Sequence, residues 1–235
     1  MTDRTLQKFI RKLNQKKCTE DIFIRPLTSN VDYAIIWDYS FSVILNKKIP
    51  SCPYPFYFIK SESGVYVGTV SDMKGDLHWF VSPNCRGKGY LRNALNEVIL
   101  PHLFQDNRSK QYISIDKNAI GDKNFNASLK TAKAIGFEEV DSINGKVNLE
   151  LSPTRFNNVP FIDGENTLID YGRLKLLKER SLHYSRLLLK IKSELEMSMG
   201  YTELVEEIEE KINGVQSVSV DIEDAYWEYL SRIKK

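Results

Sequence analysis

The sequence is poor in cysteine, with three in 235 residues. Cys18, Cys52 and Cys85 do not have a metal-binding spacing, and their odd number does not suit a framework of disulfides. Both observations favour a reducing compartment, in which thiols stay unpaired. We therefore expect three free cysteines and no bound metal.

Long apolar runs and excess charge are also lacking. No run approaches the roughly 20 apolar residues that cross a membrane, and the charged segment 1–17 lacks the apolar centre of a secretion signal. The formal net charge is only +2, which gives no general attraction to nucleic acid or anionic lipid. These absences predict a cytoplasmic protein without a membrane or nucleic-acid partner.

What the sequence does contain is an alternation of strands and helices. Apolar alternation and turn residues predict strands at 21–26, 56–60, 65–70, 76–81, 112–116, 137–140 and 147–151. Helical spacing predicts helices at 32–45, about 91–104 and 124–134. A chain of 235 residues has room for one domain of about 150 residues and an appendage.

The segment 81–91 joins a strand to a helix through glycines and cations. Backbone N–H groups at the start of a helix lack partners within it, and the peptide dipoles add positive charge there. Gly87 and Gly89 let the backbone approach a ligand closely. The junction therefore predicts a phosphate site. The alternative is a surface turn whose glycines serve conformation only.

Two common nucleotide motifs do not fit this segment. A phosphate loop of the NTPase type needs a hydroxyl for magnesium, and Tyr90 does not provide one at the required place. A dinucleotide fingerprint needs a third glycine, and Arg92 stands at that position. Neither motif explains the junction.

The junction resembles the acetyl-CoA pyrophosphate loop of the GNAT superfamily of N-acetyltransferases. That loop has Arg or Gln, two residues, Gly, one residue, then Gly or Ala. Arg86 and Gly89 match it, and Leu91 stands in place of the final small residue. Downstream, Asn-Ala-Ser at 126–128 and Gly-Phe-Glu at 136–138 resemble the second motif of the family.

The resemblance extends over about residues 20–152 and implies an α/β fold with a mixed, mostly antiparallel sheet flanked by helices. It also implies acetyl-CoA as co-substrate, bound between the strands at 76–81 and 112–116. The cofactor-binding residues that it implies are Phe80, Val81, Arg86, Gly87, Lys88, Gly89, Tyr90, Leu91, Asn126 and Ser128. Asn124 is an alternative to Asn126, and helix capping explains Asn126 and Ser128 equally well.

Acetyl transfer to an amine needs a group that accepts a proton, because an ammonium cannot attack. Asp76 and His78 are two residues apart, so both side chains point to the same face of a strand. Histidine changes charge near neutral pH, and relatives often place a carboxylate on this strand. His78 and Asp76 are therefore the catalytic candidates, and Asp116 is a third. Their structural alternatives are a histidine bonded within the sheet and a turn residue beside Gly75. Ala132 stands where many relatives have a tyrosine that protonates the leaving thiolate.

Two segments lie outside the resemblance. Segment 1–18 has the pattern of a basic amphipathic helix, which either packs on its own domain or binds a membrane or RNA. After an acetyltransferase domain at 19–153, segment 154–235 is expected to be all-α, with three helices that end at Gly200, at Asn213-Gly214 and near the C-terminus. The first carries a coiled-coil seam of Leu174, Leu177, Ser181, Tyr184, Leu188, Ile191 and Leu195. This segment is either a self-contained subdomain or the surface for a homodimer or another protein.

These motifs favour an acetyl-CoA-dependent N-acyltransferase that moves an acetyl group to a primary amine of a small molecule, a peptide or a protein. The alternative is an acyl-CoA-binding module that acts through its C-terminal helices. A narrower activity on aminoacyl-tRNA is disfavoured by the near-neutral charge.

Overall fold

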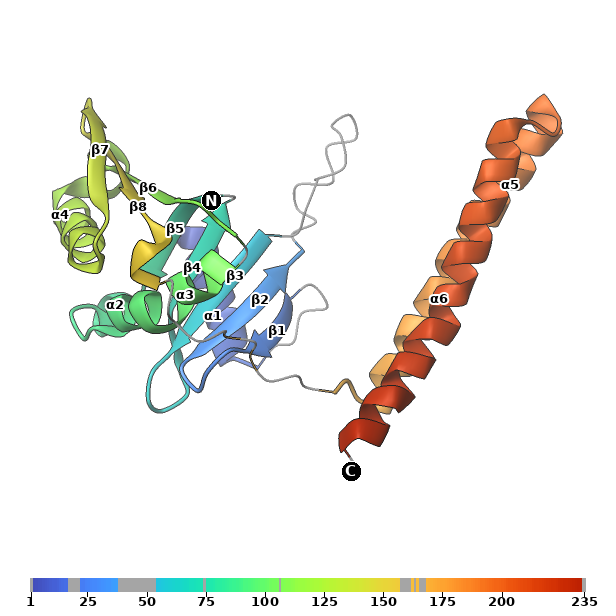
Figure 1. Cartoon of the computed structure of the whole chain (residues 1–235), viewed down its shortest axis with the longest axis horizontal. Coiled ribbons are helices and arrows are strands. Elements are labelled where there is room, and N and C mark those ends of the chain that lie inside the picture. The colour runs from blue at the N-terminus through green and yellow to red at the C-terminus, as the bar shows by residue number, and fades with distance from the viewer. Residues whose placement is uncertain are drawn as a thin grey trace. The chain divides into compact units, whose positions relative to one another are not determined.

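The computed structural model describes residues 2–16, 22–37, 54–73, 75–105, 107–156, 162, 164 and 168–233. They fall into two compact units, Met1–Asn166 and Thr167–Lys235 (Figure 1). The division comes later than the predicted 153, because Phe156 and Ile162 still pack against the core of the first unit. Cys85 is a free thiol, whereas the other two cysteines lie outside the described residues.

The first unit is built on an eight-stranded sheet with the order β1-β2-β3-β4-β5-β6-β8-β7. Its strands are β1 (Ile22–Pro26), β2 (Val31–Ile36), β3 (Tyr54–Lys60), β4 (Tyr66–Met73), β5 (Asp76–Val81), β6 (Gln111–Asp116), β7 (Glu138–Ile143) and β8 (Lys146–Leu151). Neighbouring strands are antiparallel except β5 and β6, which are parallel. The predicted mixed, mostly antiparallel sheet is confirmed.

Helices flank this sheet (Figure 1). They are α1 (Asp3–Asn14), α2 (Tyr90–Ala94), α3 (Leu100–Gln105) and α4 (Lys117–Ile135), with short turns η2 (Pro83–Cys85), η3 (Leu95–Ile99) and η4 (Pro153–Phe156). The π-helical turn η3 makes α2, η3 and α3 one continuous, irregular helix. In η3 the Leu100 N–H donates to the Leu95 carbonyl. The next residue, Pro101, has no N–H to donate.

Each face of the sheet buries its own hydrophobic cluster. Successive residues of β3 alternate between the two clusters, as side chains of a strand must. One cluster contains Leu6, Phe9 and Ile10 of α1, and the Phe9 ring lies 5.5 Å from the Phe56 ring. Of the two alternatives for the N-terminal amphipathic helix, packing on its own domain is therefore the one observed.

The helix predicted for 32–45 is wrong in its first part. Residues 31–36 form β2, which pairs with β1 on one side and β3 on the other. Val31, Ile35 and Ile36 are β-branched and favour a strand, and pairing on both edges outweighs the helical spacing that they share with later residues. The rest of the predicted helix lies outside the described residues.

The second unit is an antiparallel pair of long helices, α5 (Tyr171–Met199) and α6 (Glu203–Ile233). The prediction of three helices is wrong, because α6 passes through Gly214 without a break. A glycine inside a helix costs only about 1 kcal/mol, and the buried positions Ile212 and Ser219 stay in phase across it. Gly200 does end α5, as predicted, with a φ of 76°.

Candidate active site

The parallel strands β5 and β6 meet at one end and then diverge. Their register contains one pair, Asp76 with Tyr112. The Tyr112 N–H donates to the Gly75 carbonyl at 2.9 Å, and the Ser114 N–H donates to the Asp76 carboxylate at 2.9 Å. The Asp76 carboxylate thus accepts the N–H that would otherwise form the next hydrogen bond between the two strands. β5 and β6 are joined only at this end, which we call the apex.

Beyond the apex the gap is a cleft of about 550 Å³. Its walls are residues 77–81 of β5, residues 113–116 of β6, the glycine turn before α2, and one face of α4. Asp3 of α1 also reaches the cleft. The order strand, glycine turn, helix and diverging parallel strand agrees with the arrangement that the GNAT resemblance implies.

The backbone of β5 presents alternate residues to this gap. The Ser82 N–H donates to the Val67 carbonyl of the β4 side at 2.9 Å, so residues 78 and 80 also direct their backbone groups toward β4. Trp79 and Val81 therefore direct theirs toward the cleft. Of the two residues of β5 expected to bind the cofactor, Val81 directs its backbone groups toward the cleft and Phe80 does not, although both line it.

The glycine turn closes the end of the cleft opposite the apex. Gly87 and Gly89 have φ of 75° and 83°, and Gly89 is the N-cap of α2. The Arg86 guanidinium donates to the Val81 carbonyl at 3.0 Å and to the Asn124 Oδ1 at 2.8 Å, so it ties the turn to β5 and α4. Tyr90 and Leu91 line the cleft as well, whereas Lys88 is not among its lining residues.

One face of α4 forms the opposite wall. Ser128 lies on it and accepts a hydrogen bond from the Trp79 indole at 3.4 Å. Asn124, the alternative to Asn126, is the asparagine that lines the cleft, and Asn126 is not. Ala132, at the tyrosine position of many relatives, is fully buried in the core.

Cations are frequent around the cleft, and sequence reasoning identified only Arg86 among them. Arg92, Lys123 and Lys130 also line it. Lys123 and Lys130 are seven residues apart, a spacing that places both on one face of a helix and that was readable in the sequence. With the positive end of the α2 dipole, these side chains favour an anionic ligand in the cleft.

The two predicted bases occupy different places. His78 lines the cleft, and its Nε2 lies 3.1 Å from Oδ1 of Asp3 on α1. Asp76 is not among the lining residues, because it bonds to Ser114 at the apex. Burial raises the pKa of the Asp76 carboxyl above its usual value, and the bond from the Ser114 N–H opposes this only in part.

The third candidate base, Asp116, lines the cleft but caps α4. Its carboxylate accepts the N–H groups of Asn118 at 2.8 Å and Ala119 at 3.4 Å. Asp3, in contrast, was missed entirely, since it comes from a helix outside the resemblance and 75 residues from His78. Nothing local in the sequence connects those two side chains.

The described residues contain neither a metal-binding cluster nor a membrane-spanning helix. No group of three or more His, Cys, Asp or Glu side chains there is arranged to hold a metal ion. None of the described helices combines the length and apolar character of a membrane span.

No protein-family model and no curated protein matches the chain. Several solved structures of N-acetyltransferases are similar to it. A dodecameric spermidine N-acetyltransferase from Vibrio cholerae has a TM-score of 0.38 and 17% identity, over 51% of this chain and 73% of that chain. SpeG, a spermidine/spermine N-acetyltransferase from the same organism in complex with manganese ions, has a TM-score of 0.39 and 13% identity, over 56% and 98%. A ribosomal-protein-S5-alanine acetyltransferase from Vibrio fischeri has a TM-score of 0.34 and 17% identity, over 44% and 64%. These TM-scores mark distant similarity.

Proposed function

We propose that the chain is an acetyl-CoA-dependent N-acyltransferase that moves an acetyl group to a primary amine of a small molecule, a peptide or a protein. The observation that carries the proposal is the cleft between β5 and β6. A cationic glycine turn lies at one end of it, and His78 lies on the same strand three residues before Val81. In this proposal, phosphate recognition and proton transfer lie along one extended path.

The residues of the cleft fit acetyl-CoA. The volume of the cleft, about 550 Å³, is typical of a small-molecule site. An added Cβ at Gly87 would meet nothing within 4 Å, so the backbone of the turn is open to a ligand. We assign the pyrophosphate to Gly87, Gly89 and Arg86, and the amide-bearing arm to the backbone of Trp79 and Val81.

His78 is the proposed base. Acetyl-CoA, when bound, supplies an acetyl thioester whose thiolate is a good leaving group. A carboxylate only accepts hydrogen bonds, so the bond to Asp3 places the hydrogen of the neutral imidazole on Nε2. Nδ1 then keeps its lone pair and takes the proton of the acceptor amine. Asp3 acts through His78 as a positioning residue.

The buried Ala132 excludes an acid at that position of α4. Thiols lose their proton far more readily than amines do, so the thiolate departs without a tyrosine. The proposal therefore needs one base from this chain and no dedicated acid.

Binding and turnover test the proposal separately. Calorimetry with CoA is expected to show binding to the full chain, and Arg86→Ala is expected to weaken it about tenfold through lost charge-assisted bonds. Lys88→Ala is the matched control, because Lys88 lies in the same turn but does not line the cleft. Thiol release from acetyl-CoA across a panel of primary amines measures turnover. Binding without turnover on any amine would favour the acyl-CoA-binding module, and absence of binding would refute the cofactor assignment.

A further inference from the structure

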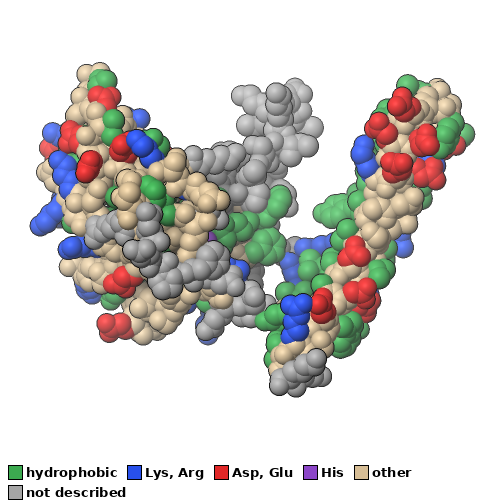
Figure 2. Space-filling view, viewed as in Figure 1, with side chains coloured by type: hydrophobic (Ala, Val, Ile, Leu, Met, Phe, Trp, Pro, Cys, Tyr) green, Lys and Arg blue, Asp and Glu red, His purple; other side chains and the backbone are tan. Residues whose placement is uncertain are grey.

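One face of β6 and β8 is polar and open to solvent. In the register of these strands Ser114 lies opposite Asn148, and Asp116 lies opposite Lys146. Cross-strand partners point to the same side of a sheet, so these four side chains share one face. None of the four is buried, whereas Ile115 belongs to the core on the other face. Figure 2 shows charged side chains of both signs on the surface around β7, the strand beside β8.

The same face continues into the cleft. Asp76 of β5 pairs with the β6 residue two positions before Ser114, so His78, two positions after Asp76, points to the side of Ser114. His78, Ser114 and Asp116 all line the cleft. The Cβ atoms of opposite residues such as Asp116 and Lys146 are about 5 Å apart. The side chain of Lys146 therefore begins beside the cleft that contains the proposed base.

The ammonium group of Lys146 extends from β8 toward β5. Burial raises the pKa of the Asp76 carboxyl, and the charges of Lys146 and His78 both oppose this rise. The whole of β6 lies between β8 and β5, so a Lys146 side chain directed across β6 brings its charge near Asp76. Lys146 and His78 thus approach the same carboxylate.

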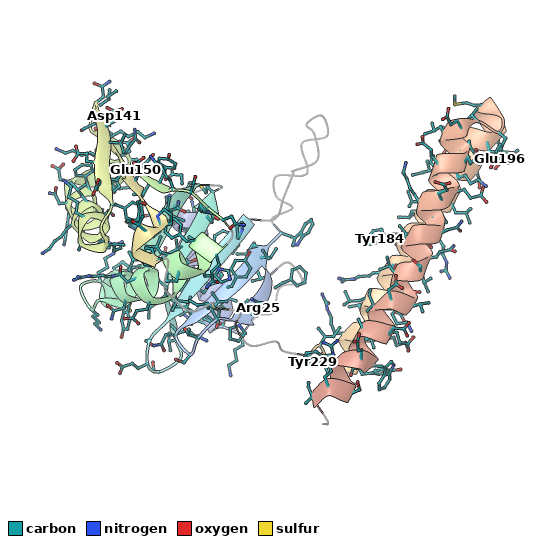
Figure 3. All side chains as sticks on the ribbon, in the orientation of Figure 1. Arg25, Asp141, Glu150, Tyr184, Glu196 and Tyr229 are labelled. Carbon is teal, nitrogen blue, oxygen red and sulfur yellow. The ribbon has the colours of Figure 1, made fainter. Side chains whose placement is uncertain are left out.

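Lys146 forms no ion pair with the carboxylates around it. Asp116, directly opposite, accepts N–H groups at the start of α4. Asp141 of β7, labelled in Figure 3, lies opposite Asn148 rather than Lys146. Among the described residues no ion pair includes Lys146, whereas Lys117, whose N–H donates to the carbonyl of the residue before Lys146, has a carboxylate partner at 2.9 Å. The exposed amine of Lys146 is therefore available for reaction.

We propose that the chain acetylates the side-chain amine of its own Lys146, an inference that rests on the proposed function. His78 accepts one proton of the Lys146 ammonium and later releases it to water. The neutral Nζ attacks the carbonyl carbon of the acetyl-CoA thioester. A C–N bond forms, the C–S bond breaks, and the second proton that the nitrogen loses goes to the departing thiolate. The products are an acetyl amide at Lys146, which no longer carries a charge, and free CoA.

Peptide mass spectrometry of the full chain after incubation with acetyl-CoA tests the inference. Lys146 is expected to be acetylated about 100-fold faster than Lys117, because only Lys146 has a general base within reach. Lys117 is the matched control, since it is exposed and lies beside the same turn. N-hydroxysuccinimidyl acetate, which needs no binding site, is expected to label both lysines. Equal rates for the two lysines with acetyl-CoA overturn the inference.

A variant and a dilution series show where the reaction takes place. His78→Gln is expected to slow the acetylation of Lys146 about 100-fold and to leave the rate at Lys117 unchanged. Transfer within one chain has a rate constant that does not change with protein concentration. A rate constant that rises in proportion to protein concentration overturns the inference, because the amine then comes from another chain.

The thiol assay separates this inference from the proposed function. Without an added amine, the wild type is expected to release CoA thiol and Lys146→Arg is expected not to. An unmodified Lys146 overturns the inference in every case. Turnover of free primary amines by the same sample then shows that the proposed function stands, and its absence shows that both fail.

Discussion

The Asp76 carboxylate is held away from the cleft by one hydrogen bond from the backbone. The Ser114 N–H donates to it at the apex, and the side chain is absent from the lining of the cleft. Asp76→Asn keeps an oxygen that accepts this bond. We therefore expect Asp76→Asn to retain the wild-type rate of thiol release.

The same substitution has a pH signature in stability. Because burial raises the pKa of Asp76, the folded chain keeps a proton that the unfolded chain releases, and stability falls as pH rises from the usual value of 3.8 through the raised pKa. Asparagine does not ionise, so Asp76→Asn does not lose stability in this way as pH rises. Urea unfolding is expected to show Asp76→Asn gaining stability relative to wild type between pH 4 and pH 7. A relative loss over that range would contradict the assignment.

His78 and Asp3 are expected to affect turnover without affecting binding. His78→Gln removes the proposed base, and general bases contribute about 10² to 10⁴ in rate. Asp3→Asn leaves the imidazole in place but no longer fixes its tautomer, so a smaller fall in kcat, about tenfold, is expected with KM for acetyl-CoA unchanged. Asp3→Glu is expected to restore part of kcat, and equal melting temperatures exclude a structural cause. A rise in KM with constant kcat would contradict the positioning role.

At the residue scale the sequence predicted one end of the cleft better than the other. Arg86, Gly87 and Gly89 are consecutive or nearly so, and their chemistry is local, so the glycine turn was recognisable. The partner of His78 comes from α1, and that contact depends on tertiary packing. Asn124 lies four residues before Ser128 and shares its face of α4, whereas Asn126 lies two residues before it and does not, so helical spacing could have decided between the two asparagines.

Among the elements around the cleft, the glycine turn is the one whose backbone is proposed to bind the pyrophosphate. Gly89→Ala is expected to cost about 1 to 2 kcal/mol in stability, because its φ of 83° is strained for any residue with a Cβ. The added Cβ would come no closer than 3.8 Å to Asn93, so strain rather than a clash is the cause. Relaxing that strain moves the start of α2, and CoA affinity is expected to fall about tenfold.

Gly214→Ala in α6 is the matched control for the loss of stability and CoA affinity expected of Gly89→Ala. Gly214 lies inside a helix, and an added Cβ would meet nothing within 4 Å. Alanine is expected to raise stability by about 1 kcal/mol and leave CoA affinity unchanged. If Gly89→Ala behaves like Gly214→Ala in chemical denaturation, the left-handed conformation of the turn is not required.

The elements that the sequence predicted correctly are those whose local pattern agrees with their tertiary setting. β5 and β6 combine strand-forming residues with pairing along the sheet. β2 and α6 were misread for opposite reasons: the first had helical spacing but two strand neighbours, and the second contained Gly214 but a continuous buried seam. In both cases packing outweighed a local preference of about 1 kcal/mol.

At the scale of the whole molecule, the proposed acetyl transfer depends on the first unit. Among the described residues, the buried members of both sheet clusters lie between Leu6 and Phe156, so both clusters belong to the first unit. The cleft also lies entirely within that unit, from Asp3 to Ala134. The proposed acetyl transfer is therefore expected to remain when the first unit is separated from the second.

A chain of residues 1–166 is expected to fold, to bind CoA with the affinity of the full chain, and to release thiol at the same rate. A chain ending at residue 153 is the informative comparison. It loses Phe156, which is 8% exposed and stacks on Phe104 at 5.5 Å, so its free energy of unfolding is expected to be lower by about 2 kcal/mol. Calorimetry, the thiol assay and chemical denaturation of both chains measure these quantities. If 1–166 folds but binds CoA more weakly than the full chain, the cleft depends on the second unit and the expectation is wrong.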